Sequence, residues 1–261
     1  MENYQGYEKE NINYWSNRAP GYSEVNRSEL RSGQHRVWGS TLAERISRHY
    51  PGRQPEEISV LDIGTGPGFF AIILAEMGYQ VTAVDYTGSM LEKARTNAGE
   101  WNRKIRFMEM NAEQLVFQEN TFDVIVSRNL TWNLYHPDQA YREWERVLKP
   151  GGLLMNFDAN WYRYLYDEEA REGYRQDREN IKAAGVANET DGTDIPAMEA
   201  IACQAPLSAV SRPGWDMDFL GSLGMKAKAD PEIWRTVWTR EERINNASTP
   251  MFLVQAVKGA H

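Results

Sequence analysis

Five short apolar runs rich in β-branched residues alternate with helix-like segments along this chain. The runs cover residues 58–63, 80–85, 105–108, 122–127 and 153–157. The segments between them that have the apolar spacing of helices are residues 69–77, 89–101 and 138–148. Strands that are apolar on both faces and alternate with helices are typical of a parallel sheet covered on both sides. We therefore expect the α/β class, with an open, doubly wound sheet at the core.

Local residues determine where these helices should end. We expect Gly78 to close the first helix and Asp138 to cap the start of the third. Residues 150–152, Pro-Gly-Gly, should end the third helix, because proline lacks the N–H that a helix needs and glycine readily adopts the left-handed conformation found at helix ends.

Two regions flank the predicted core of residues 51–158 with a different pattern. Residues 1–50 are polar, aromatic and mostly helical in spacing, which predicts an N-terminal helical cap. Residues 159–214 interrupt the alternation with a charged helix at 167–184 and a polar loop at 185–194. They predict a helical lid insertion over the sheet. Because the insertion is too short to fold alone, we expect a single domain spanning the chain.

The tail, residues 215–261, contains two further extended candidates that would close the sheet. They are residues 225–233 and 251–257, and residues 239–250 between them are polar and turn-like. The chain contains no internal repeat and no low-complexity tract.

Charge and cysteine content narrow the function classes. Basic residues number 29 and acidic residues 37, a net charge of −8, which disfavours nucleic acids and anionic membranes as partners. Cys203 stands alone, so no internal disulfide can form, and the cytoplasm is the expected location. The four histidines lack metal-ligand spacing, and we expect no metal site. No targeting segment is recognised, and the longest apolar run, residues 69–75, is too short to span a membrane.

A glycine-rich loop, Asp-Ile-Gly-Thr-Gly-Pro-Gly at residues 62–68, follows the first predicted strand. Its spacing is G-x-G-x-G, and Phe69 stands where a dinucleotide-binding fingerprint would have its third glycine. Pro67 also removes one N–H that a phosphate would use. Asp62 places a carboxylate ahead of the loop, which suits a cationic amine better than a pyrophosphate.

An acidic residue, Asp85, ends the second predicted strand, where it can accept hydrogen bonds from both hydroxyls of a ribose. Ligands of open α/β sheets bind at the carboxyl ends of the strands, where this residue and the glycine loop meet. The loop therefore favours a ligand with an amine and a ribose, such as S-adenosylmethionine.

Residues 60–157 resemble the core of class I S-adenosylmethionine-dependent methyltransferases of the broad small-molecule type. The matching pieces, in order, are residues 60–68, Asp85, residues 111–113, residues 122–127 and residues 146–152. The resemblance extends to residues 14–22 and to the last two candidate strands. It implies a Rossmann-like, mostly parallel seven-stranded sheet with an antiparallel last strand.

The resemblance also implies a site for S-adenosylmethionine. The cofactor-binding residues carried over are Tyr14, Arg18, Tyr22, Asp62, Gly64, Thr65, Gly66, Gly68, Asp85, Tyr86, Met90, Asn111, Ala112, Glu113, Arg128 and Asn129. Among them, Asp62 would hold the methionine amino group, Asp85 the ribose and Arg18 the carboxylate. Asn111 stands where the family usually has aspartate.

The methyl acceptor is expected to be a neutral or cationic small molecule. The candidate substrate-binding residues are His35, Trp132, Tyr135, Asp158, Trp161 and Tyr162. No catalytic residue is assigned, because a sulfonium methyl donor is already activated and a general base is optional. The Asn/Asp-Pro-Pro-Tyr signature of exocyclic-amine methyltransferases is missing after the fourth strand.

Three alternatives remain open at this level. The chain could be a non-catalytic module that binds S-adenosylmethionine and regulates a partner, or an enzyme that transfers a different group on the same fold. A nicotinamide-dependent dehydrogenase is disfavoured by the glycine spacing. Acceptor identity and oligomeric state do not follow from the sequence.

Overall fold

Seven strands form one sheet in the computed structural model, which describes residues 2–259. They are β1 (Ser59–Ile63), β2 (Gln80–Asp85), β3 (Ile105–Glu109), β4 (Phe122–Arg128), β5 (Leu148–Asp158), β6 (Lys226–Asp230) and β7 (Phe252–Val257). The strand order is β3-β2-β1-β4-β5-β7-β6. β1 to β5 pair in parallel, whereas β7 runs antiparallel to β5 and β6. The predicted doubly wound, mostly parallel sheet with an antiparallel last strand is confirmed.

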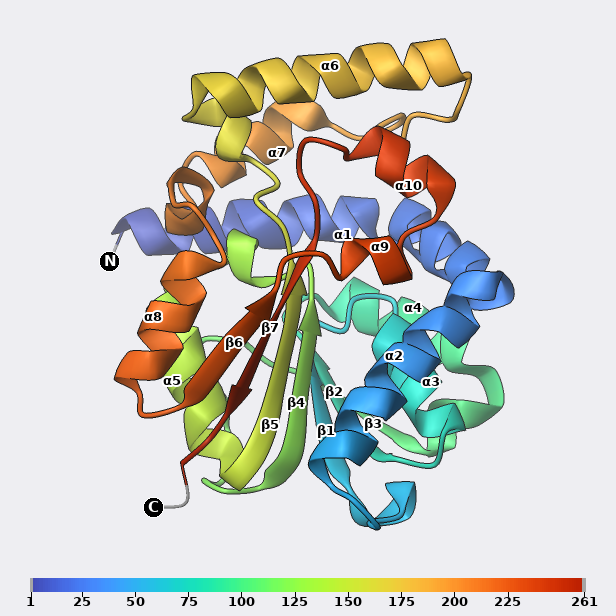
Figure 1. Cartoon of the computed structure of the whole chain (residues 1–261), viewed down its shortest axis with the longest axis vertical. Coiled ribbons are helices and arrows are strands. Elements are labelled where there is room, and N and C mark those ends of the chain that lie inside the picture. Colours follow the sequence, from blue (N-terminus) through green and yellow to red (C-terminus); the bar gives the residue numbers. More distant parts are fainter. Residues whose placement is uncertain (1, 260–261) are drawn as a thin grey trace.

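Helices cover both faces of this sheet (Figure 1). The principal ones are α2 (Gly33–His49), α3 (Phe69–Glu76), α4 (Gly88–Ala98), α5 (Pro137–Val147) and α8 (Gly214–Ser222). On one face Trp38 of α2 and Phe70 of α3 pack edge-on against Phe157 of β5. On the other face Trp144 of α5 is fully buried. Because the central strands β1 and β4 are covered on both sides, their residues are buried almost throughout.

Two predicted boundaries of α5 are wrong. The helix begins with Pro137 in its first turn, and Asp138 lies within that turn without capping it. After the helix, the chain runs directly into β5, which includes residues 150–152. The strand starts early because Leu148 already pairs with Phe122 of β4.

Glycines with positive φ end two other helices. Gly78, at φ +94°, follows the end of α3 as predicted. Gly99, at φ +51°, ends α4 earlier than the expected boundary at residue 101, and the chain continues as a short 3-10 helix, Gly99–Arg103. The left-handed conformation at these positions suits glycine, which has no Cβ.

The N-terminal cap consists of α1 (Glu2–Arg31) and α2. α1 lies across the end of the sheet at which the parallel strands finish (Figure 1). Ser32 separates the two helices and caps α2, because its hydroxyl accepts a hydrogen bond from the Gln34 N–H.

The insertion forms a second layer above the cap. Its helices are α6 (Glu168–Ala184) and α7 (Ile195–Ala202), and the predicted polar loop at 185–194 joins them. α7 packs on α1, where Met198 and Ile201 join Tyr7 and Tyr14 in one buried cluster. Much of the insertion therefore covers the sheet only indirectly, because α1 lies between them (Figure 1).

The tail holds more helix than expected. β6 is shorter than the predicted strand at 225–233, and α9 (Trp234–Val237) follows it. The turn-like residues 239–250 contain α10 (Arg240–Asn245). Thr239 and Glu242 form a capping box at the start of α10, a Thr-x-x-Glu signal that is visible in the sequence.

No helix among residues 2–259 is long and apolar enough to cross a membrane.

Candidate functional site

A large cavity opens at the carboxyl ends of the strands, next to the point where the strand order reverses between β1 and β4. This is where ligands of open α/β sheets bind. The cavity holds about 890 Å³ of space, part of it open to solvent, and α1 covers it. Most of the predicted cofactor residues line it, namely Tyr22, Gly64, Gly66, Asp85, Tyr86, Met90, Asn111, Ala112, Glu113, Arg128 and Asn129. Their roles as cofactor ligands stay predictions.

A smaller cavity of about 310 Å³ adjoins the large one. The two cavities share Tyr22, Gly64, Gly66 and Arg128 as lining residues. The smaller one also reaches Asp62 and Thr65, which are predicted cofactor residues, and Asn26 of α1. An elongated ligand can therefore extend from the ends of β2 and β3 to the carboxylate at the end of β1.

The glycine loop adopts backbone conformations that favour glycine. Gly64, Gly66 and Gly68 have φ values of +69°, +53° and +95°. A Cβ on Gly64 would lie 2.7 Å from Cδ2 of Leu130, another residue that lines the large cavity. A side chain at position 64 would therefore require the Leu130 side chain or the loop to shift.

The Asp85 carboxylate holds the glycine loop against the end of β2. It accepts hydrogen bonds from the N–H of Gly66 at 2.8 Å and from the N–H of Thr87 at 2.9 Å. Burial raises the pKa of this carboxyl, while the two backbone donors act in the opposite direction. Asp85 lines the large cavity, where an ionised carboxylate suits ligand hydroxyls as donors.

Asp62 is a buried carboxyl in the smaller cavity. The Thr65 hydroxyl donates a hydrogen bond to its Oδ2 at 2.6 Å. Burial raises the pKa of Asp62 to about 7, because the charged form is poorly solvated there. A cationic ligand group beside this carboxyl would supply the missing stabilisation and lower its pKa.

Buried polar atoms without partners mark the region where the two cavities meet. Arg128 pairs through Nη2 with Glu29 at 2.6 Å, and its guanidinium lies over the Phe69 ring at 4.5 Å. Its Nη1 atom has no hydrogen-bond partner among residues 2–259, and neither has Oδ1 of Asn129. Buried polar atoms are almost always satisfied, so these two atoms indicate a polar ligand. An anionic group suits Nη1, and a donor suits Oδ1.

The segment after β3 is held by its own hydrogen bonds. Glu113 is nearly fully buried, and its Oε1 accepts from the N–H groups of Tyr135 and His136, each at 2.9 Å. Asn111 accepts the Glu113 N–H at 2.8 Å and donates to the Tyr4 hydroxyl at 3.1 Å. Glu113 therefore shapes the wall of the cavity by holding residues 135 and 136 in place.

Sequence reasoning missed half of the lining. The missed residues are Tyr4, Tyr7, Glu8, Asn11, Ile12 and Trp15 of α1, together with Thr87, Met110, Leu130, Asn133 and Leu134. The α1 residues had a signal, because positions 4, 7/8, 11 and 15 recur at helical spacing and occupy one face of a helix.

Three predicted cofactor residues line neither cavity: Tyr14, Arg18 and Gly68. Tyr14 is buried in the cluster between α1 and the insertion, with Trp15 edge-on to it, and Trp15 lines the cavity in its place. Gly68 lies under the loop, where a Cβ would contact Ala94 of α4 at 3.1 Å. Its role is to bring α3 and α4 together.

Of the predicted substrate-binding residues, only Tyr135 lines the large cavity. The structure corrects His35, whose Nε2 pairs with Glu76 of α3 at 2.6 Å on the outer face of the cap. Trp132 and Tyr162 stack on each other, with ring centroids 4.7 Å apart, beside the insertion.

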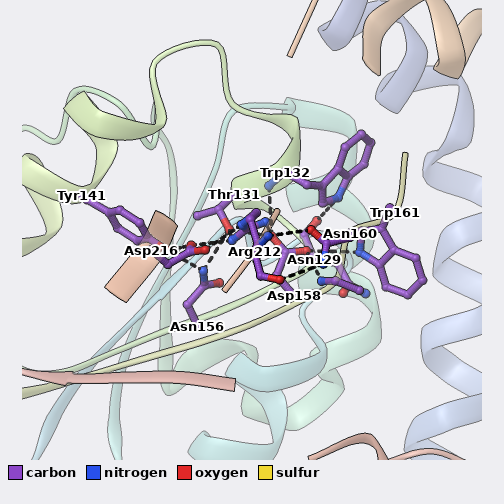
Figure 2. A network of polar contacts seen from close by, with 11 residues as sticks. Asn129, Thr131, Trp132, Tyr141, Asn156, Asp158, Asn160, Trp161, Arg212 and Asp216 are labelled. Atoms are coloured by element: carbon purple, nitrogen blue, oxygen red, sulfur yellow. Dashed lines mark hydrogen bonds and ion pairs between the residues drawn. The ribbon is translucent and has the colours of Figure 1, made fainter. Parts of the chain in front are cut away.

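Asp158 and Trp161 are corrected in the same way. The Asp158 side chain is completely buried, and all of its contacts are with the protein, including Nε1 of Trp161 at 3.2 Å (Figure 2). The Trp161 ring packs towards Trp238. Within residues 2–259, no group of three or more His, Cys, Asp or Glu side chains is arranged to hold a metal ion.

The chain is similar to known methyltransferases. Residues 61–156 match a family model described as "Methyltransferase domain". The chain is 34% identical over 162 residues to the ubiquinone/menaquinone biosynthesis C-methyltransferase UbiE of Bartonella tribocorum, a match that covers 57% of this chain and 59% of that protein. It is 30% identical over 172 residues to the demethylmenaquinone methyltransferase of Leptospira interrogans, covering 62% and 66%.

The fold is shared with solved structures as well. A SAM-dependent methyltransferase from Aquifex aeolicus superposes with a TM-score of 0.51 at 18% identity, over 82% of this chain and 88% of that one. The sequence match to the first curated relative covers about three fifths of that protein's length. The superposition on the Aquifex aeolicus structure covers most of this chain. The resemblance predicted from the motifs is confirmed.

Proposed function

We propose that this chain is a class I S-adenosylmethionine-dependent methyltransferase and that it transfers a methyl group to a small-molecule acceptor. The observation that carries the proposal is the pair of adjoining cavities at the end of β1 and β4. They combine a glycine loop, a strand-end carboxylate at Asp85 and a buried carboxyl at Asp62. No single one of these features specifies the cofactor, but together they suit an adenosine joined to an amino acid.

The residues present fit S-adenosylmethionine. Asp85 would hold the ribose, and Asp62 would hold the methionine ammonium group. The unpartnered Nη1 of Arg128 suits the carboxylate, and it is a second candidate for the role predicted for Arg18. When bound, the cofactor supplies an activated methyl group on a sulfonium. The chain then has to hold the acceptor in line and exclude water, and α1 and its aromatic side chains cover the cavity for that purpose.

We propose a planar, uncharged small molecule as the acceptor. Tyr7, Trp15 and Tyr135 give the large cavity aromatic walls, which suit a flat ring. The relatives named for menaquinone and ubiquinone biosynthesis make a demethylated quinone the first compound to test. We further propose that the chain acts as one domain in the cytoplasm and without nucleic acid, in keeping with its net charge of −8 and its single cysteine.

The proposal is tested by binding and transfer together. Calorimetric titration should give micromolar affinity for S-adenosylmethionine and S-adenosylhomocysteine and none for NADH. Labelled methyl groups should then appear on demethylmenaquinone or on another flat acceptor in a panel of quinols, phenols and amines. Binding without transfer to any acceptor would instead support a regulatory module, and NADH binding alone would overturn the assignment.

Cofactor affinity should depend on pH through Asp62. The ammonium group of the cofactor pairs with the ionised form of the Asp62 carboxyl. Burial raises the pKa of this carboxyl to about 7 in the free protein. Affinity should therefore rise about tenfold between pH 6 and pH 8, in proportion to the ionised fraction. The same raised pKa makes the free protein lose stability as pH rises from about 4 through 7, because the folded state holds the proton more tightly than the unfolded state.

Calorimetry at both pH values measures this dependence. 5′-Methylthioadenosine is the matched control, since it keeps the adenosine and lacks the amino acid, and its affinity should change little. In the Asp62→Asn variant the affinities for S-adenosylmethionine and for 5′-methylthioadenosine should show the same dependence on pH. An equal pH response for both ligands in the unsubstituted protein would place the titrating group at Asp85.

A further inference from the structure

A buried polar network lies at the carboxyl ends of β4 and β5, outside both cavities (Figure 2). Its centre is Arg212, whose side chain is completely buried. Nη1 donates to Oδ2 of Asp158 at 2.6 Å, and Nε and Nη2 donate to the two oxygens of Asp216 at 2.9 and 2.7 Å. One guanidinium therefore joins the end of the insertion to β5 and to α8.

The two ends of the insertion are fixed to each other at the same place. Asn160 donates through Nδ2 to the Arg212 carbonyl at 2.9 Å, and the Arg212 N–H donates to Oδ1 of Asn160 at 3.0 Å. Residues 160–212 thus leave and re-enter the fold at one point, and Arg212 connects that point to the sheet.

The network also fixes the segment that follows β4. The Thr131 hydroxyl donates to Oδ2 of Asp158 at 2.5 Å and accepts from Nη2 of Arg212 at 2.6 Å and from Nδ2 of Asn156 at 2.9 Å. One donor and two acceptor positions are all that a hydroxyl has, so this group is fully used. The Trp132 N–H donates to the same Asp158 oxygen at 3.0 Å.

This segment is a wall of the large cavity. Residues 129, 130 and 133 line it, and Thr131 and Trp132 lie between them. The Asn133 carbonyl accepts a hydrogen bond from the Tyr7 hydroxyl of α1 at 2.8 Å. Hydrogen bonds on either side of the Trp132–Asn133 peptide bond therefore connect Arg212 in the insertion to the helix that covers the cavity.

Beyond Asn129, which is a predicted cofactor residue, we assign this wall to the acceptor side of the site. The residues assigned to the amine, ribose and adenine follow β1, β2 and β3, whereas the segment 129–133 follows β4, across the point where the strand order reverses. Arg212 contacts none of the residues assigned to the cofactor. Asn129, at the start of the wall, is a predicted cofactor residue, but Arg212 bonds to Thr131 and to Asp158, so its influence should be larger on the acceptor than on the cofactor.

We propose that Arg212 is a positioning residue for methyl transfer, which holds the cavity wall 129–133 through Asp158 and Thr131 and so sets the placement of the acceptor. The inference rests on the proposed function for its kinetic part. The three nitrogens of a rigid guanidinium donate four hydrogen bonds, in directions that a single ammonium cannot reproduce. Lysine at position 212 should consequently keep the charge and lose the placement.

The test compares Arg212→Lys and Thr131→Val with a matched control. The control is Asp123→Asn, which disturbs a buried carboxylate at the opposite end of β4, paired with Arg53 at 2.8 Å and Lys149 at 2.9 Å. For the two test variants, kcat/KM for the acceptor should fall about 10- to 100-fold, the usual effect of misplacing a reactant by about 1 Å. The dissociation constant of S-adenosylhomocysteine should stay within about twofold. The control should leave both quantities unchanged.

Amide hydrogen exchange of residues 129–133 provides a readout that does not depend on activity. Exchange there should become faster in both test variants and stay unchanged in Asp123→Asn. Unchanged exchange and unchanged kcat/KM would overturn the proposal, and so would a parallel loss of S-adenosylhomocysteine affinity. If the unsubstituted protein binds the cofactor but methylates no acceptor, the proposed function fails. In that case the exchange result still decides whether Arg212 holds the wall. Thr131→Val keeps the side-chain volume, so it serves if Arg212→Lys does not fold.

Discussion

Alanine in place of Gly64 should reduce the affinity for S-adenosylmethionine by about a hundredfold while the protein stays folded. The new Cβ would lie 2.7 Å from Cδ2 of Leu130, and the backbone at φ +69° disfavours any side chain. Relief requires a shift of Leu130 or of the loop, and both line the cavity. The fold should survive because Leu130 is only partly buried and its side chain can move. Calorimetric titration measures the change.

Gly52→Ala is the matched control for this experiment. Gly52 has a similar backbone angle, φ +84°, but a Cβ there meets nothing within 4 Å. Gly52 lies in the turn after α2 and does not line the cavity. The control should lose stability from the strained angle and keep its affinity. A Gly64→Ala variant that binds as well as Gly52→Ala would contradict the assignment of the loop.

Alanine in place of Asp85 should weaken cofactor binding by about 1.5–3 kcal/mol, the usual loss for hydrogen bonds to a charged group. Two effects add up in this variant. The ribose hydroxyls lose their acceptor, and the Gly66 N–H loses the carboxylate that holds the glycine loop in place. Asp85→Asn keeps one oxygen acceptor and should therefore lose less.

Glu109→Ala is the matched control for Asp85. Glu109 ends β3 and lies directly beside Asp85 in the register of the sheet, but it is exposed and lines neither cavity. Its removal changes the same charge one strand away and should leave the affinity unchanged. If Asp85→Ala and Glu109→Ala bind the cofactor equally well, the ribose is held elsewhere.

The cofactor half of the site followed from neighbouring residues. A glycine loop after the first strand and an acidic residue after the second both lie at strand ends, and parallel strands bring their carboxyl ends to one edge. Position along the chain was therefore sufficient to bring Gly64, Gly66 and Asp85 together. Arg18 lines neither cavity, because the inward face of α1 carries Glu8, Asn11 and Trp15, and its role in cofactor binding stays a prediction.

The acceptor half failed for a different reason. Asp158 ends a strand at the same edge of the sheet as Asp85. Its carboxylate, however, pairs with Arg212, which lies 54 residues further along the chain. His35 has the chemistry of a catalytic group, but it pairs with Glu76 on a neighbouring helix. In both cases a distant partner decides whether a polar side chain is available to a ligand.

Short-range patterns of apolar and glycine residues were enough for the sheet, its helices and the cofactor loop, because backbone geometry imposes those periods locally. Long-range packing alone determined that α1 covers the cavity, that the insertion lies on α1, and that Arg212 neutralises Asp158. Those contacts depend on which surfaces meet after the chain has folded, and residue spacing does not encode that choice.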